Sequence, residues 1–277
     1  MLYTSIHHLL GVGILDWVAQ LPPVGFGMRV LMLSDIHGNA DALRVVLESA
    51  GKWDAVWLLG DFVDYGPEPH VVIDIIRDLR PDALVMGNHD NAVAFDTDCR
   101  CAQEIHELSE YTRREVSLKL LSREQIEWLK TLPKTVEIIL DGRRHYIVHG
   151  SPRNPLYGYV KPDLQPAELR LSLTPSMVAL RPKPVEADVV AVGHTHVPMS
   201  ITVDGIKVVN PGSCGQPRDG DPRASYAIYN TEVGSVEIRR VWYDIERVAR
   251  KIGELKLEDR YSKWLTAILR AGKVQPP

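Results

Sequence analysis

Cysteine is scarce in this sequence of 277 residues. Only three occur, Cys99, Cys101 and Cys214, and an odd number of this size does not form the disulfide framework of an extracellular domain. Cys99 and Cys101 lack the second cysteine pair that a structural zinc site needs, so we interpret them as plain thiols. A reducing, cytoplasmic setting is therefore expected.

An excess of basic residues is also missing. The 32 Lys and Arg are outnumbered by 36 Asp and Glu, which gives a net charge of −4 and argues against extended nucleic-acid binding, although a local basic pocket stays open. No apolar run reaches the length of about 18 residues that a membrane-spanning helix needs. Apolar residues make up 45% of the chain, enough for a folded core. We interpret four tryptophans as packing residues: Trp53, Trp57, Trp128 and Trp242.

The first 27 residues lack the basic segment that opens a secretory signal. Met28 opens the first clear strand, so we interpret residues 1–27 as an N-terminal extension or a start-site error. A short helix over Leu9 to Leu21 is the alternative. Residues 28–277 are expected to form one domain.

Three strands in the first half of the domain are each followed by polar residues. The strands are expected over Arg29 to Leu33, Ala55 to Leu59 and Ala83 to Met86, and helical patterns over Ala42 to Leu47 and Val71 to Leu79 separate them. In α/β sheets, ligands bind in the crevice outside the carboxyl ends of strands. The polar loops are therefore expected to converge.

The second half of the domain changes character. A helical insertion is expected over about residues 100–132, and a closing helix over about residues 244–272. Asp141-Gly142 and Asp204-Gly205 each lie between two β-rich runs, which predicts hairpins with type I′ turns. A further strand pair is expected around Gly234.

Five segments carry side chains of the kind that bind divalent metals. Any one of them could be an ordinary helix cap, but five such loops in one chain favour a shared site. Carboxylate, imidazole and amide oxygen together suit Mn²⁺, Fe²⁺, Zn²⁺, Co²⁺ or Ni²⁺, whereas Ca²⁺ prefers an oxygen cage. The segments are Asp35-Ile36-His37, Gly60-Asp61-Phe62-Val63-Asp64, Gly87-Asn88-His89-Asp90, His149-Gly150 and Gly193-His194-Thr195-His196.

In their order and glycines, these five segments resemble the motifs of the calcineurin-like metallophosphoesterase superfamily, and within it the small prokaryotic phosphodiesterases of the YfcE type. The resemblance runs from about Met28 to Trp242. It implies an α/β fold, a four-layer α-β-β-α sandwich of two mixed sheets with a helical insertion. It also implies an enzyme that hydrolyses a small soluble phosphate ester through attack by a metal-bridging hydroxide.

The resemblance further implies two divalent transition-metal ions, with Mn²⁺ as the first expectation. An aspartate with two oxygens can bridge ions about 3.5–4 Å apart, the spacing of two-metal sites. By resemblance, one ion is held by Asp35, His37 and His196, the other by Asn88, His149 and His194, and Asp61 bridges the two.

The remaining roles also come from the resemblance. His89 is the expected general acid beside the leaving group, Asp90 is expected to orient or charge the His89 imidazole, and Asp64 is expected to accept hydrogen bonds near the metals. Three arginines are considered for holding a phosphate oxygen: Arg153, Arg218 and Arg223.

The substrate stays open within this class. A phosphoprotein phosphatase, a nucleotide pyrophosphatase or a diadenosine-polyphosphate hydrolase would use the same motifs, and a homo-oligomer is compatible with them. The alternative of another class is a scaffold that keeps the fold without catalysis. Every expected ligand position is filled, as is that of His89, and this favours an enzyme.

Overall fold

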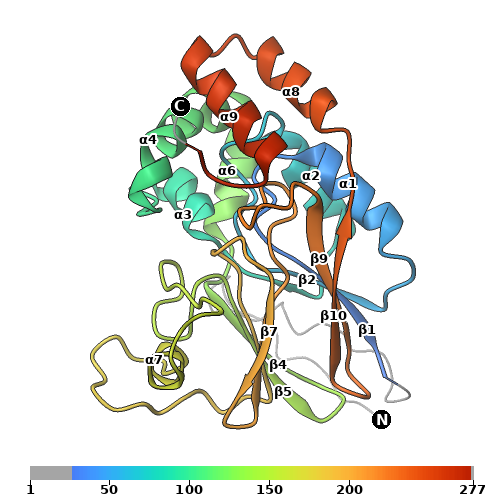
Figure 1. The fold of residues 1–277 in the computed structure, drawn as a ribbon, viewed down its shortest axis with the longest axis vertical. Coiled ribbons are helices and arrows are strands. Elements are labelled where there is room, and N and C mark those ends of the chain that lie inside the picture. Colours follow the sequence, from blue (N-terminus) through green and yellow to red (C-terminus); the bar gives the residue numbers. More distant parts are fainter. Residues whose placement is uncertain (1–26, 276–277) are drawn as a thin grey trace, which may run out of the picture.

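Residues 27–275 are described by a computed structural model of the chain, drawn in Figure 1. The helix considered for Leu9 to Leu21 lies outside this part. The first half contains β1 (Arg29–Leu33), α1 (Ala40–Ser49), β2 (Ala55–Leu58), α2 (Pro69–Leu79), β3 (Ala83–Leu84), α3 (Asn88–Phe95), α4 (Gln103–Thr112), the π-helical turn η1 (Arg113–Ser117), α5 (Leu118–Leu120) and α6 (Arg123–Lys130). The second half contains β4 (Thr135–Leu140), β5 (Arg143–Val148), α7 (Pro166–Ser172), β6 (Val189–Ala191), β7 (Met199–Val203), β8 (Ile206–Asn210), β9 (Ala224–Asn230), β10 (Ser235–Val241), α8 (Ile245–Glu254) and α9 (Asp259–Ala271).

Two mixed sheets of five strands each form the centre of the molecule. The first has the order β10-β9-β1-β2-β3, in which β1, β2 and β3 run parallel and β9 is antiparallel to both of its neighbours. The second has the order β4-β5-β6-β8-β7, with β5, β6 and β8 parallel and the two edge strands antiparallel. The expectation of an α/β fold with two mixed sheets is confirmed.

The helices cover the outer faces of the two sheets. Side chains of α1, α2, α8 and α9 pack with the outward residues of the first sheet in the largest apolar cluster. On the far side of the molecule, α7 packs on the second sheet, as Figure 1 shows. The layers are therefore helix, sheet, sheet and helix, as expected. Among residues 27–275, no helix combines the length and apolarity that crossing a bilayer requires.

Strand β1 shows why the two sheets stay together. Its residues alternate between two environments, since Leu31 and Leu33 contact the helical layer while Val30 and Met32 face the second sheet. Both faces of this strand are therefore covered and apolar, as is typical of strands in parallel α/β sheets. Trp57 of β2 is the largest fully buried side chain of this inner layer.

The hairpins form where the sequence predicted them. Asp141 and Gly142 join β4 to β5 with φ values of 48° and 71°, and Asp204 and Gly205 join β7 to β8 with φ values of 50° and 84°. A type I′ turn requires positive φ at both central residues, and Asp-Gly tolerates this. The strand pair around Gly234 is also present, as β9 and β10.

The helical segments are more broken than the sequence indicated. The stretch expected over about 100–132 is divided into α4, η1, α5 and α6, and Ser122 starts α6 with a capping box. The expectation of one closing helix over about 244–272 is wrong. The chain forms α8 and α9 instead, because Lys256 between them adopts a left-handed φ of 54°, which no α-helix can continue.

Trp57 and Trp242 provide a matched test of the inner layer. Trp57 is fully buried, whereas Trp242 is 64% exposed, so the interpretation of Trp242 as a packing residue is wrong. We predict that Trp57→Ala lowers the free energy of unfolding by about 3–5 kcal/mol, because it leaves a cavity between the sheets. Trp242→Ala should change it by less than about 0.5 kcal/mol. Urea unfolding measures both, and equal losses would contradict this account of the core.

Candidate metal centre

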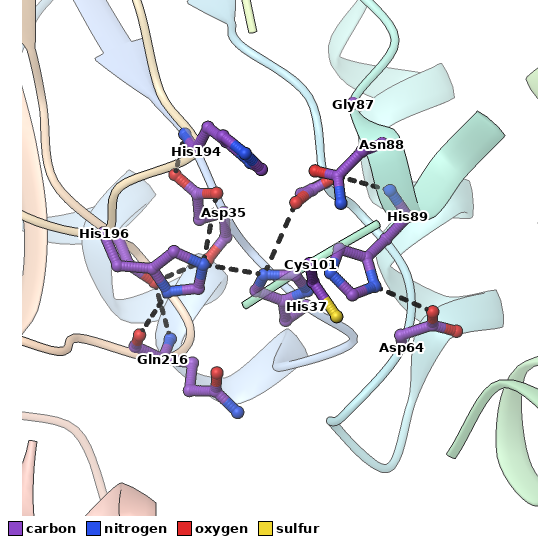
Figure 2. Close-up of polar contacts among 12 residues, drawn as sticks. Asp35, His37, Asp64, Gly87, Asn88, His89, Cys101, His194, His196 and Gln216 are labelled. Atoms are coloured by element: carbon purple, nitrogen blue, oxygen red, sulfur yellow. Dashed lines mark hydrogen bonds and ion pairs between the residues drawn. The ribbon is translucent and has the colours of Figure 1, made fainter. Parts of the chain in front are cut away.

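Ligand-type side chains from five loops meet at the edge where the parallel strands of both sheets end. Figure 2 shows several of them pointing into one space from different elements. A parallel strand presents its carboxyl end at the same edge as its neighbours, so the loops that follow are brought together. The contributions are Asp35 and His37 after β1, Asp61 after β2, Asn88 and His89 after β3, His149 after β5, and His194 and His196 after β6.

The first group of ligand atoms comes from Asp35, His37, Asp61 and His196, and all four atoms lie within 4.8 Å of one another. Nε2 of His37 is 3.2 Å from Nε2 of His196 and 3.8 Å from Oδ2 of Asp61. Nε2 of His196 is 3.4 Å from Oδ1 of Asp35. Ligand atoms bound at about 2.0–2.2 Å to one ion stand about 3–3.5 Å apart, so this spacing fits a single cation.

The second group of ligand atoms surrounds His149. Its Nε2 lies 3.2 Å from Oδ2 of Asp61, 3.2 Å from Nδ1 of His194 and 3.0 Å from Oδ1 of Asn88. Asp61 therefore belongs to both groups, and the same oxygen atom faces each of them.

Backbone carbonyls orient three of the imidazoles. A histidine that donates its Nδ1–H to a carbonyl is fixed in one tautomer and keeps the Nε2 lone pair for a metal. Nδ1 of His37 lies 2.9 Å from the carbonyl oxygen of Val63, Nδ1 of His149 lies 2.7 Å from that of Leu59, and Nδ1 of His196 lies 2.6 Å from that of Gln216.

Two buried carboxylate oxygens test whether the centre fits a metal. Oδ1 of Asp35 and Oδ2 of Asp61 accept no hydrogen bond from residues 27–275, although both side chains are almost fully buried. An unsatisfied buried oxygen is costly, and native structures rarely contain one without a partner such as an ion. These two oxygens lie among the histidine nitrogens described above, so the residues fit divalent cations.

Burial sets the protonation of three of the histidines. It holds the pKa of His37, His194 and His196 well below the ordinary value, because the charged imidazolium is disfavoured away from water. These rings are therefore neutral. A neutral imidazole is the form that binds a metal ion.

The buried carboxylates of Asp35 and Asp61 are stabilised by positive charge nearby. Burial raises the pKa of Asp35 to about 6, and the nearby Asp61 contributes to this rise. Burial alone would lower the pKa of His149, but the Asp61 carboxylate overrides it and raises this pKa to about 9. A divalent ion supplies the same positive charge and competes with the proton for the His149 ring.

Many of these residues have an unusual backbone. A positive φ in a non-glycine residue is uncommon and clusters at functional sites, where neighbouring structure enforces it. Gly87 shows how closely the chain is packed here, since a Cβ at this position would stand 2.1 Å from Oδ1 of Asp61. Six of the site residues have positive φ: Asp35, His37, Asp61, Asp64, His194 and His196.

His89 stands beside the metal ligands and is held by the helical insertion. Its Nδ1 lies 2.9 Å from Oδ2 of Asp64 and 3.3 Å from Oγ of Ser109 on α4, and Figure 2 shows the first of these contacts. Ser117 of η1 donates to Oδ1 of Asp64 at 2.7 Å. Burial opposes the charged ring, but Asp61 and Asp64 raise the pKa of His89 to about 9. The imidazole is therefore protonated at neutral pH.

The expected role of Asp90 as the partner of the His89 ring is wrong. Its carboxylate accepts the backbone N–H groups of Asp61 and Phe62, both at 2.8 Å, and of Gly87 at 2.9 Å. The reason is its position as the third residue of α3, where a side chain turns back to cap the helix. Asp64 takes the place at the His89 ring, rather than acting only as an acceptor near the metals.

The contribution of Ser109 and Ser117 was not predicted from the sequence, nor was the position of the cysteine pair beside the site. Cys99 and Cys101 are free thiols with sulfurs 2.8 Å apart, and Sγ of Cys99 is 3.2 Å from Oγ of Ser109. The carbonyl of Cys99 accepts Nδ2 of Asn88 at 2.8 Å. The one sequence feature that pointed to this position was that Cys99 and Cys101 follow Asn88 after about ten residues.

Comparison with known proteins identifies the family. The model of the calcineurin-like phosphoesterase superfamily domain matches residues 28–234. This chain belongs to that superfamily. The fold, with its two mixed sheets, agrees with this membership, and the chain is thereby a member of a superfamily of phosphoric ester hydrolases.

Three relatives show how far the likeness extends. The crystal structure of a metallophosphoesterase from Sphaerobacter thermophilus is 33% identical, with a TM-score of 0.72 over 88% of this chain and 99% of that one. An uncharacterized protein of Methanocaldococcus jannaschii is 29% identical over 264 residues, which are 88% of this chain and 98% of that protein. The phosphodiesterase YfcE of Escherichia coli is 27% identical over 215 residues, which are 76% of this chain and 91% of that protein.

Two of the arginines considered for substrate in this phosphoesterase point elsewhere. Arg153 donates to the carbonyl oxygens of Met177 at 2.6 Å and Ala179 at 3.1 Å, and so holds a surface loop. Arg223 forms an ion pair with Asp221 at 2.6 Å. Neither residue lines the cavity that contains His194, and the expectation that either holds a phosphate oxygen stays a prediction.

Arg218 lies near the ligand-type residues. Its Nη2 and Nε donate to Oε1 of Gln216 at 2.7 and 3.2 Å, and its guanidinium lies 5.6 Å from the ring centre of Tyr65. It lines the same cavity as His194. Burial lowers the pKa of His196, and the charge of Arg218 lowers it further. The charge of Arg218 therefore acts on the histidines of this centre.

Asp90→Asn tests the corrected role of this residue. We predict that it lowers the free energy of unfolding by about 2–4 kcal/mol, because an amide group replaces an acceptor shared by three buried N–H groups. Asp78→Asn on the exposed side of α2 is the control and should cost less than about 0.5 kcal/mol. Urea unfolding measures the free energy of unfolding of both variants, and a chelator in the buffer removes any stabilisation by bound metal. A stability equal to that of the control would contradict the capping role.

Proposed function

We propose that this chain is a phosphodiesterase that depends on two divalent metal ions and hydrolyses a small soluble phosphate ester. The observation that carries the proposal is the shared position of Asp61, whose Oδ2 faces both groups of ligand atoms. One carboxylate between two such groups is the arrangement of two-metal phosphoesterase sites. The relation to the phosphodiesterase YfcE supports a diester as substrate.

The ligand assignment follows the two groups. Imidazole, carboxylate and amide oxygen in one centre suit Mn²⁺, Fe²⁺, Zn²⁺, Co²⁺ and Ni²⁺. Among these, Mn²⁺ is the first candidate, as the resemblance to the metallophosphoesterases implies. When bound, the ions supply positive charge at the phosphoryl group and an activated water. Asp35, His37 and His196 would hold one ion, Asn88, His149 and His194 the other, and Asp61 both.

The proton for the leaving group comes from His89 in this proposal. Its ring is positively charged because Asp61 and Asp64 raise its pKa, and its Nδ1 is engaged by Asp64. Nε2–H is then the group that would donate the proton. Asp64 holds the ring in this orientation, and Ser117 holds Asp64 in turn. Arg218 would bind a non-bridging phosphate oxygen, with Gln216 positioning its guanidinium.

The scaffold alternative finds less support. A non-catalytic relative does not need buried carboxylate oxygens without partners, nor a charged imidazole next to them. Phosphoprotein and diadenosine-polyphosphate substrates remain variants of the same chemistry. A cytoplasmic location belongs to the proposal, and the free thiols of Cys99, Cys101 and Cys214 support it.

An assay of the Mn²⁺-loaded protein tests the reaction class. Bis(4-nitrophenyl) phosphate serves as diester and 4-nitrophenyl phosphate as monoester. We expect hydrolysis of both, with the higher kcat/KM for the diester. A preference for the monoester would indicate a phosphatase instead, and hydrolysis of neither would contradict the proposed function.

His89→Asn tests the proton donor. With a diester whose leaving group is an unactivated phenol, we predict a fall in kcat of about 10²- to 10⁴-fold, because a weakly acidic alcohol needs protonation as it departs. With 4-nitrophenolate as the leaving group the fall should be smaller, since this anion departs without a proton. Metal content, measured by mass spectrometry, should not change.

His70→Asn is the matched control for this variant. His70 lies on α2 and belongs to neither group of ligand atoms, so its replacement should leave both rates unchanged. If His89→Asn reduced kcat equally for the two substrates, the residue would position the substrate rather than donate a proton. An unchanged rate on both substrates would exclude any catalytic role.

A further inference from the structure

Two free thiols lie in contact beside the metal centre, in the segment that joins α3 to α4. Sγ of Cys99 donates a hydrogen bond to Sγ of Cys101 over 2.8 Å. Arg100 between them has a left-handed φ of 48°, and its N–H donates to Oδ1 of Asp98 at 2.7 Å. An aspartate that accepts the N–H two residues further on closes a tight turn. The turn brings the two sulfurs together, so a bond between them needs only a small movement of the side chains.

Cys101 is the thiol of this pair that a small oxidant can reach. It is partly exposed, whereas Cys99 is completely buried. Ala102, the next residue along the chain, lines a cavity of about 910 Å³ whose walls also include His194 and Arg218. A small molecule that enters this cavity therefore has access to Cys101, while Cys99 is shielded from it.

The surroundings of Cys101 favour its reactive thiolate form. The hydrogen bond from Cys99 lowers the pKa of the Cys101 thiol, although partial burial opposes this shift. The hydroxyl of Tyr65, 3.8 Å from Sγ of Cys101, and the charge of Arg218 lower the pKa further. Thiolates rather than thiols react with peroxides, so Cys101 is the attacking residue and Cys99 the resolving one. Cys214 differs from Cys101, because it is completely buried and burial raises the pKa of its thiol.

The cysteine pair is joined to the metal centre and to the proton donor by hydrogen bonds. The carbonyl of Cys99 accepts Nδ2 of Asn88 at 2.8 Å and so orients the amide whose Oδ1 belongs to the second group of ligand atoms. Sγ of Cys99 lies 3.2 Å from Oγ of Ser109, which lies 3.3 Å from Nδ1 of His89. Figure 2 shows Cys101 beside His89, and one ligand-type atom from each of His89, Cys99 and Cys101 lies within 4.8 Å of the others. A movement of Cys99 is therefore transmitted to both sites.

We propose that Cys99 and Cys101 are a site of reversible oxidation, at which hydrogen peroxide forms a disulfide bond that lowers the rate of the enzyme. The Cys101 thiolate attacks the peroxide and takes one oxygen as a sulfenic acid, and the hydroxide that leaves recovers the thiol proton as water. The Cys99 thiol then attacks the sulfenic sulfur, the S–S bond forms and a second water leaves. The two thiols are thus oxidised by two electrons, and one peroxide is reduced to two waters. A dithiol reverses the reaction by thiol–disulfide exchange.

The disulfide lowers the rate because it changes the contacts that Cys99 makes. Its sulfur turns toward Cys101 and no longer carries an S–H group beside Ser109. Closing the small ring also moves the carbonyl that holds Nδ2 of Asn88. A displacement of about 1 Å in a catalytic site can cost about 100-fold in rate. This part of the inference rests on the proposed function, whereas the formation of the bond does not.

Peptide mapping tests the bond without any measurement of activity. Metal-free protein is treated with hydrogen peroxide, the peroxide is removed with catalase, the remaining thiols are alkylated, and the protein is digested with trypsin. Trypsin cleaves after Arg100, between the two cysteines, so the bond joins the peptides of residues 78–100 and 101–113. We expect mass spectrometry to find this joined pair and dithiothreitol to separate it. Two separately alkylated peptides after the peroxide treatment would overturn the inference.

A rate measurement tests the effect of the bond on the enzyme. The oxidised protein is loaded with Mn²⁺ after the peroxide has been removed, and bis(4-nitrophenyl) phosphate is the substrate. We expect kcat to be about 10- to 100-fold lower than in the untreated protein and to recover with dithiothreitol. Cys101→Ser should keep its own untreated rate after oxidation, whereas the matched control Cys214→Ser should lose rate as the unmodified protein does.

The outcomes separate this inference from the proposed function. If the untreated protein hydrolysed no phosphate ester, the proposed function would fail, and the peptide mapping would still decide whether the bond forms. A disulfide that leaves kcat unchanged would overturn the link to the metal centre and leave the phosphodiesterase intact. An equal loss of rate in Cys101→Ser and in the unmodified protein would place the sensitive group elsewhere and would also overturn that link.

Discussion

The architecture of this protein depends on the cost of burying negative charge. Asp35 and Asp61 are almost fully buried, their ligand atoms lie within 4.8 Å of each other, and one oxygen of each has no hydrogen-bond donor among residues 27–275. Such a pair is stable only where positive charge enters between the carboxylates. The neutral imidazoles of His37, His194 and His196 surround the two carboxylates without adding charge. The centre is therefore a binding site for cations by its electrostatics as well as by its ligand types.

The scaffold brings these charges together through strand ends. Parallel strands of both sheets finish at the same edge, and the loops after them turn sharply through residues with positive φ, such as Asp35, Asp61 and His194. Backbone carbonyls then fix the rings of His37, His149 and His196. The buried apolar layer around Trp57 packs the two sheets against each other, and the helical insertion supplies Ser109 and Ser117, which contact His89 and Asp64. Stability and function thus share the same framework.

The sequence predicted the strands, the hairpins and the loops that converge, because each depends on local patterns such as polar residues after an apolar run or Asp-Gly between strands. It did not predict the exchange of roles between Asp64 and Asp90, since this follows from which way a side chain turns in the first helical turn of α3. Ser109 and Ser117 were missed because the folding of the insertion over the site is not local. The partners of Arg153 were missed for the same reason, since Met177 lies 24 residues away in the sequence.

The position of Asp61 between two cations is the central claim, and anomalous diffraction from crystals of the Mn²⁺-loaded protein tests it most directly. The account predicts two anomalous peaks about 3.5–4 Å apart, with the Asp61 carboxylate in contact with both. A single peak, or two peaks of which only one contacts Asp61, would contradict it.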